Sequence, residues 1–154
     1  METKASTFFS PEEQSEILSA IRKAEKKTSG EIRVHIETSL EGEVLDRAAW
    51  VFRVIGMQRT ELHNGVLFYL AVRDRKFAII GDSGINAVVP DDFWDNIRDH
   101  LAERFSKEQF AEGLTEAIML AGEQLGAHFP RAVGDINELP DDISFDDPFK
   151  FSEK

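Results

Sequence analysis

The stretch that decides the fold is Val66-Leu67-Phe68-Tyr69-Leu70-Ala71-Val72, near the middle of a chain of 154 residues. Successive side chains of a β-strand point to opposite faces of the sheet, so a strand with one solvated face alternates apolar and polar residues. This run is apolar or aromatic at every position. It therefore predicts a central strand whose two faces are both covered.

The residues before this run predict a helix, a strand and a second helix. Ser10-Pro11-Glu12-Glu13 combines a capping serine, a proline suited to the first helical position and a capping-box glutamate, so a helix begins there. From Glu31 to Glu37, charged or polar residues alternate with isoleucine and valine, which predicts a half-buried strand. The segment from Val44 to Ile55 carries the apolar stripe of a second helix.

The residues after the run predict a hairpin and two more helices. Arg73-Asp74-Arg75 turns the chain into an antiparallel strand over Lys76 to Ile80, and Gly81-Asp82-Ser83-Gly84 follows as a flexible loop. A third helix opens at Pro90-Asp91-Asp92, and a fourth runs from about Lys107 to Phe129.

This order of elements predicts a single α/β domain over residues 8–130, built on a small mixed β-sheet sandwiched between helices. The first two strands form a right-handed βαβ crossover, and the hairpin adds an antiparallel strand. Residues 131–154 are acidic and lack a hydrophobic period, so we expect a loosely ordered C-terminal tail. The tail residues that could dock on the edge of the sheet are Ile136, Leu139, Ile143 and Phe145.

The composition limits the classes of partner. A net charge of −11 opposes phosphate backbones, so we expect no nucleic-acid partner; it favours cations and basic surfaces, and it also serves solubility. The chain has no cysteine, which excludes a thiolate nucleophile and a Cys-based zinc site. No apolar run suits a signal peptide or a membrane span, so we expect a cytoplasmic monomer.

Two apparent catalytic signals are rejected. Gly81-Asp82-Ser83-Gly84 spells the nucleophile loop of chymotrypsin-like proteases, but those enzymes are larger all-β proteins, and a triad is defined by geometry. The four histidines show no ligand spacing, and we expect each to be a solvated surface residue. Only His63 has neighbours of interest, because it precedes Asn64 and the start of the central strand.

A group of carboxylates remains as the candidate site. Asp91, Asp92 and Asp95 lie within five residues at the expected start of the third helix, where they can serve as caps. If the third strand returns beside the second, Asp82 also comes near Asn64 at one end of the sheet. Converging oxygen ligands suit Ca²⁺, or alternatively Mg²⁺, so helix capping and a divalent-cation site are the two interpretations.

The chain resembles the TPM domain family, in particular its stand-alone bacterial members. The resemblance spans about Phe8 to Pro130 and rests on four motifs: Ser29-Gly30-Glu31-Ile32-Arg33-Val34-His35-Ile36, Asn64-Gly65-Val66-Leu67, the segment from Lys76 to Ile85, and the acidic helix start. It implies a Rossmann-like α/β/α sandwich with a divalent cation, usually calcium, held by acidic loops. It also places Asn64, Asp82, Asp91, Asp92 and Asp95 in the family's acidic site, together with Gly81 and Gly84.

We therefore expect a domain that binds a divalent cation and has an interaction or maintenance role, with a protein partner as one candidate. The alternative is a weak metal-dependent phosphatase, because some members of the family are described as phosphatases. A phosphatase needs a cationic side chain to hold phosphate, and the acidic group contains no lysine or arginine. Arg59 is the candidate that could reach the group from outside it.

Overall fold

A computed structural model describes residues 3–131 and 143–147. The sheet has the strand order β3-β2-β1-β4. Its strands are β1 (Glu31–Glu37), β2 (Gly65–Ala71), β3 (Lys76–Gly81) and β4 (Ile143–Phe145). The helices are α1 (Ala5–Phe8), α2 (Pro11–Glu25), α3 (Val44–Val54), the 3-10 helix η1 (Met57–Arg59), α4 (Ser83–Asn86), α5 (Asp95–Ser106) and α6 (Phe110–His128).

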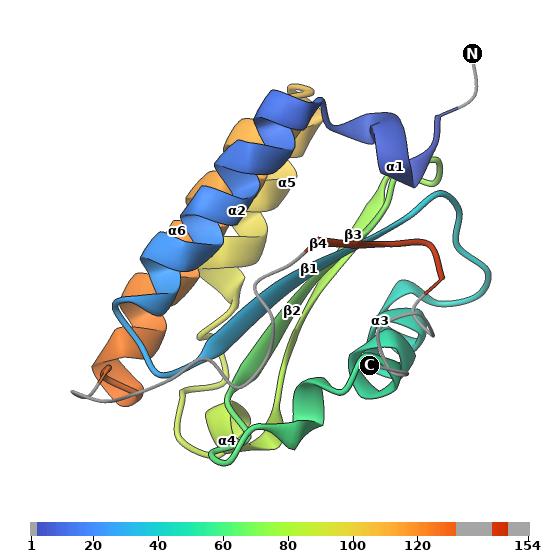
Figure 1. Cartoon of the computed structure of the whole chain (residues 1–154). Coiled ribbons are helices and arrows are strands. Elements are labelled where there is room, and N and C mark those ends of the chain that lie inside the picture. Colours follow the sequence, from blue (N-terminus) through green and yellow to red (C-terminus); the bar gives the residue numbers. More distant parts are fainter. Residues whose placement is uncertain (1–2, 132–142, 148–154) are drawn as a thin grey trace.

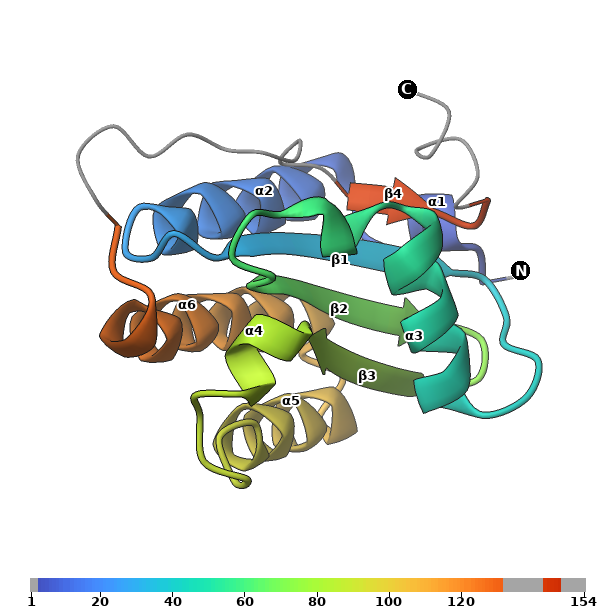
Figure 2. The ribbon, with the colours of Figure 1, turned by 90° about the horizontal axis from the view of Figure 1, so that it is seen from below.

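The predicted sandwich is confirmed, with β2 as an interior strand. All seven residues of β2 are buried, β1 lies parallel to it, and β3 lies antiparallel. Helices α2, α5 and α6 cover one face of the sheet and α3 covers the other (Figures 1 and 2). Val66, Phe68 and Leu70 belong to the larger core on the first face, whereas Leu67, Tyr69 and Ala71 belong to the smaller core under α3. The two-sided apolar pattern thus has a direct structural cause.

The start of α2 also follows its sequence. Ser10 Oγ accepts a hydrogen bond from the Glu13 backbone at 3.1 Å, and Glu13 Oε1 accepts one from the Ser10 backbone at 2.9 Å. This capping box satisfies two amide groups that the first helical turn would otherwise leave without partners.

The prediction that β1 is half-buried is wrong. Ile32, Val34 and Ile36 enter the larger core as expected, but the alternate residues are also buried: Glu31, Arg33, His35 and Glu37 are at most 3% exposed. The reason is tertiary: α3 lies on this side of the sheet and its Arg47 pairs with Glu37, while β4 adds a further strand beside β1. His35 is therefore an interior residue, and the expectation of a solvated side chain is corrected.

Part of the C-terminal segment belongs to the sheet. Residues Ile143–Phe145 form β4, which pairs with β1 in parallel, with His35 opposite Ser144. Asp146 strengthens this attachment, because its Oδ1 accepts a hydrogen bond from the Thr38 backbone at 2.6 Å and its Oδ2 accepts one from Thr38 Oγ1 at 3.0 Å. The expectation of loose order does not hold for these residues, while the other predicted docking residues, Ile136 and Leu139, lie outside the described part.

Two local expectations between β3 and α5 are corrected. The expected flexible loop contains the short helix α4, and α5 begins at Asp95 rather than at Pro90. Residues 91–94 form turns instead, and Trp94 in these turns packs against Gly81, where a Cβ atom would lie only 2.6 Å from Trp94 Cζ2.

Within the described residues, no helix has the length and hydropathy needed to cross a membrane.

Candidate functional site

The starts of β1 and β2 and the end of β3 meet at one end of the sheet, which we call the Asp82 end. Glu31 lies opposite Gly65 in the parallel pair, and Val66 lies opposite Gly81 in the antiparallel pair. This register places Asp82, the residue after β3, next to the start of β2, where its backbone N–H donates to the Gly65 carbonyl at 3.0 Å. The predicted convergence of these segments is therefore present.

Asp82 has one carboxylate oxygen in use and one available. Its Oδ1 accepts a hydrogen bond from the Ser83 backbone at 2.7 Å, in the N-cap position of α4. Its Oδ2 is buried and accepts no hydrogen bond from the described residues, although His63 Nδ1 lies 3.5 Å away. A buried carboxylate oxygen without a donor is unfavourable, so this position suits a cation or a bound water.

The loops on either side of Asp82 are in close contact. The Gly84 backbone donates to the His63 carbonyl at 2.9 Å, and a Cβ atom at Gly84 would lie 2.6 Å from that same carbonyl oxygen. Glycine is therefore required at this position, because any larger residue would separate α4 from the segment before β2. His63 itself adopts a φ of 49°, an uncommon backbone conformation for a residue with a side chain.

Asn64 holds the start of β2 in place. It is buried, its backbone N–H donates to Thr60 Oγ1 at 3.2 Å, and its Nδ2 donates to Ser29 Oγ at 3.2 Å. These bonds join the segments that precede β1 and β2, so the position of Asn64 near Asp82 has a structural explanation. Its role as a cation ligand stays a prediction.

The other three predicted ligands lie around the start of α5. Asp91 and Asp92 are exposed in the turns before the helix, and neither caps it, because the N-cap residue is Trp94. Asp95 lies in the first turn and pairs with Arg98, so a cationic side chain already neutralises this carboxylate. Capping by Asp91 or Asp92, the alternative interpretation of these residues, is therefore not how α5 begins.

The acidic residues do not form a complete metal centre in this structure. Over residues 3–131 and 143–147, no three histidine or carboxylate side chains are grouped so that they could hold one ion. The donor set at the Asp82 end fits a divalent cation only in part: it supplies one preformed carboxylate oxygen, and the other ligands would have to be carbonyl groups, water or rearranged loop carboxylates.

A second polar cluster, which sequence reasoning missed, lies on the face of β1 opposite to Ile32, Val34 and Ile36. The Glu37 carboxylate accepts hydrogen bonds from Arg47 Nε at 2.8 Å, from Arg47 Nη2 at 2.6 Å and from the Tyr69 hydroxyl. His35 Nε2 lies 3.5 Å from Glu37 Oε2, and His35 Nδ1 lies 2.6 Å from Ser144 Oγ. One feature of the sequence could have indicated this cluster: charged and polar residues alternate along β1, the strand that pairs with the fully apolar β2.

The electrostatics of this cluster favour an ionised Glu37. Burial raises the pKa of Glu37, but the hydrogen bonds from Arg47, His35 and Tyr69 outweigh burial and lower that pKa from 4.5 to about 2. Burial and the neighbouring carboxylate raise the pKa of the Tyr69 hydroxyl well above its ordinary value, so Tyr69 remains a hydrogen-bond donor. The hydrogen bond to Glu37 likewise raises the pKa of Arg47.

The sequence of contacts from Ser144 through His35 to Glu37 is formally that of a nucleophile, a base and an orienting carboxylate. Ser144 and His35 are fully buried and Glu37 is 3% exposed, so a substrate has no access to the serine. The cluster therefore holds β1, α3 and β4 together and is not a catalytic site in this conformation.

Comparisons with known proteins agree with this architecture. The chain is 49% identical to the BA42 protein of the psychrophilic bacterium Bizionia argentinensis, whose NMR structure matches with a TM-score of 0.87 over 92% of this chain and 98% of that one. The N-terminal domain of the cg2496 protein of Corynebacterium glutamicum is 18% identical, with a TM-score of 0.60 over 84% of this chain and 81% of that one, and shares the fold.

No curated protein matches the chain. The model of the TPM domain matches residues 3–124, which include α1 to α5, the strands β1 to β3 and most of α6. The predicted family resemblance is thereby confirmed, and the chain belongs to the TPM domain family.

Proposed function

We propose that the chain binds a divalent cation, Ca²⁺ in the first instance and Mg²⁺ as the second candidate, at the Asp82 end of the sheet, in an interaction or maintenance role. The observation that supports this proposal is Asp82 Oδ2, a buried carboxylate oxygen without a hydrogen-bond donor in the described structure. The net charge of −11 favours a cation as its partner.

The preformed part of the site is small, so the affinity should be modest. Ca²⁺ usually takes six to eight oxygen ligands, and sites with few carboxylates bind at about 10⁻⁴–10⁻³ M. Asp91 and Asp92 are exposed in turns outside the helix, so they are the candidates to complete the coordination when an ion is present. Asp95 is the least suitable, because an ion would have to compete with Arg98.

A metal titration tests the proposal. Ca²⁺ and Mg²⁺ are added to ¹⁵N-labelled protein, and we expect the amide signals of Asp82, Ser83, Gly84 and the residues before β2 to shift in a saturable manner. Asp82→Asn should abolish these shifts, whereas Glu16→Gln, which removes one exposed charge from α2, should preserve them. Identical titrations of the two variants would reject Asp82 as a ligand.

The second candidate is a weak metal-dependent phosphatase, supported by one observation: the imidazole of His63 is 56% exposed and lies 3.5 Å from Asp82 Oδ2. An exposed imidazole can transfer protons during hydrolysis. Arg59, however, lies exposed beside Gly56, where a Cβ atom would be 3.3 Å from Arg59 Nε and Cζ, and nothing in the described structure directs its guanidinium toward Asp82. We therefore rank cation binding first.

Turnover of p-nitrophenyl phosphate separates the two candidates. A phosphatase should lose its activity in both Asp82→Asn and His63→Gln and should require Ca²⁺ or Mg²⁺. Saturable ion binding without turnover would leave cation binding as the function. Turnover that is equal in the wild type and both variants would point to a contaminating enzyme.

A further inference from the structure

At the opposite end of β3 lies a pocket of about 400 Å³ that neither candidate function uses. Four phenyl rings form its wall, one from each of α1, β3, α5 and α6: Phe8, Phe77, Phe105 and Phe110. The rings contact one another in series, with centroid distances of 5.1 Å for Phe8–Phe110, 5.3 Å for Phe105–Phe110 and 5.5 Å for Phe77–Phe105. We call this site the phenyl pocket.

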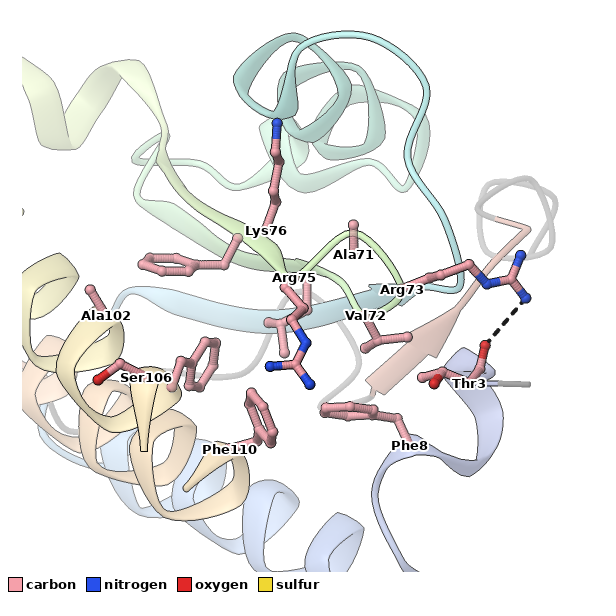
Figure 3. A pocket seen from close by; sticks show the side chains of 13 residues that line it. Thr3, Phe8, Ala71, Val72, Arg73, Arg75, Lys76, Ala102, Ser106 and Phe110 are labelled. Atoms are coloured by element: carbon pink, nitrogen blue, oxygen red, sulfur yellow. Dashed lines mark hydrogen bonds between the residues drawn. The ribbon is translucent and has the colours of Figure 1, made fainter. Parts of the chain in front are cut away.

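The rim of the phenyl pocket is basic, although the chain as a whole is acidic. Arg73, Arg75 and Lys76, from the β2–β3 hairpin, line it, and no described acidic residue does. In Figure 3 the Arg75 guanidinium points toward the rings of Phe8 and Phe110, whereas the Lys76 ammonium points away from them. Arg73 is directed toward the Thr3 carbonyl, to which its Nη2 donates at 3.5 Å (Figure 3).

Arg75 can engage a ligand at little cost. Its Nη2 lies 3.6 Å from Glu108 Oε1, and the two side chains are 70% and 69% exposed. Such an exposed ion pair contributes little to stability and exchanges readily for a stronger carboxylate partner. A guanidinium binds a carboxylate through two parallel hydrogen bonds, and these strengthen when the carboxylate sits beside an apolar wall.

We propose that the phenyl pocket binds a medium-chain monocarboxylate, with its hydrocarbon tail against the four rings and its carboxylate on Arg75. The half-buried rings offer apolar surface, and the single inward-pointing cation favours one negative charge at one end of the ligand. The volume falls in the range of about 300–1,000 Å³ that is typical of small-molecule sites. This inference is independent of the proposed cation site, which lies at the other end of β3.

The test uses the full-length ¹⁵N-labelled protein with chelator present, so that no calcium soap forms. Sodium decanoate is titrated and compared with 1-decanol, which has the same tail without the charge. We expect saturable shifts at Phe8, Phe77, Phe105, Phe110 and the hairpin, and tighter binding of decanoate than of decanol. Arg75→Gln should weaken decanoate on the order of tenfold, because it removes a charge-assisted pair, and leave decanol unchanged.

Two further variants serve as controls. Lys76→Gln removes the same charge from the same rim, but its side chain points away from the rings, so decanoate affinity should change less than about twofold. Ala102 is exposed on α5 and lines the pocket, so Ala102→Trp should fill it and abolish both ligands without disturbing the core. Equal effects of Arg75→Gln and Lys76→Gln, equal affinity for decanoate and decanol, or shifts outside the pocket would overturn the proposal.

Discussion

The guanidinium of Arg47 on α3 donates two hydrogen bonds to the carboxylate of Glu37 on β1, from Nε at 2.8 Å and from Nη2 at 2.6 Å. This bidentate pair joins α3 to the sheet. Arg47 is further held by Trp50, since its guanidinium carbon lies 4.4 Å from the centre of the indole ring. Contacts within the chain itself therefore hold the Arg47–Glu37 pair in position.

We expect Glu37→Gln to destabilise the fold by about 2–4 kcal/mol, because it leaves the partly buried Arg47 without its counter-charge. Urea denaturation monitored by circular dichroism measures the change in free energy of unfolding. Glu43→Gln, at an exposed position just before α3 whose side chain makes no cap, is the matched control and should stay within about 0.5 kcal/mol of the wild type. Equal stabilities for the two variants would contradict the role given to the pair.

The stability of the protein should fall in acid through Glu37. Because the pKa of Glu37 is lowered from 4.5 to about 2, its contribution is complete above pH 4.5 and is lost as the pH decreases toward 2. A shift of this size corresponds to about 3 kcal/mol. Urea midpoints at pH 7, 4 and 3 should converge for the wild type and Glu37→Gln as the pH is lowered; a difference that stays constant with pH would argue against this assignment.

Gly84→Ala should loosen the Asp82 end of the sheet. The added Cβ would lie 2.1 Å from the Leu62 carbonyl oxygen, so backbone must move, at a cost of about 1–3 kcal/mol. Ser83→Ala, which alters the exposed neighbour without adding volume, is the control and should be close to neutral. Thermal melts give the stability, and a metal titration of Gly84→Ala should also be weakened if Asp82 is a ligand. A melting temperature unchanged by Gly84→Ala would show that the segments around Leu62 and Gly84 can move apart without loss of stability.

Removal of residues 132–154 should destabilise the domain. The truncation takes away β4, the Ser144 partner of His35 and the two hydrogen bonds from Thr38 to Asp146. A loss of about 2–3 kcal/mol lowers the melting temperature by roughly 5–10 °C in a domain of this size. Asp146→Ala, which removes only the Thr38 contacts, should produce a smaller decrease. A truncated protein that melts at the wild-type temperature would mean that β4 adds nothing to stability.

Local patterns in the sequence were sufficient for the order of the longer helices and of strands β1 to β3, and for the architecture. The apolar run at Val66 to Val72 identified the interior strand, and the capping box at Ser10 identified the start of α2, because both signals depend only on residues close in sequence. The βαβ crossover followed by a hairpin then determined which strand ends meet, and so placed Asp82 near the start of β2.

Tertiary packing decided the rest. The alternation from Glu31 to Glu37 has the pattern of a solvated strand, but its polar residues are interior in the folded chain, where Arg47 of α3 pairs with Glu37 and Ser144, from a distant segment, lies opposite His35. Likewise, Trp94 packs on Gly81 in the turns before α5, and α5 begins only at Asp95. The carboxylate of Asp95 forms an ion pair with Arg98. Periodicity reports which residues share a face of a strand or helix, whereas the burial and the partners of that face depend on contacts between segments far apart in the chain.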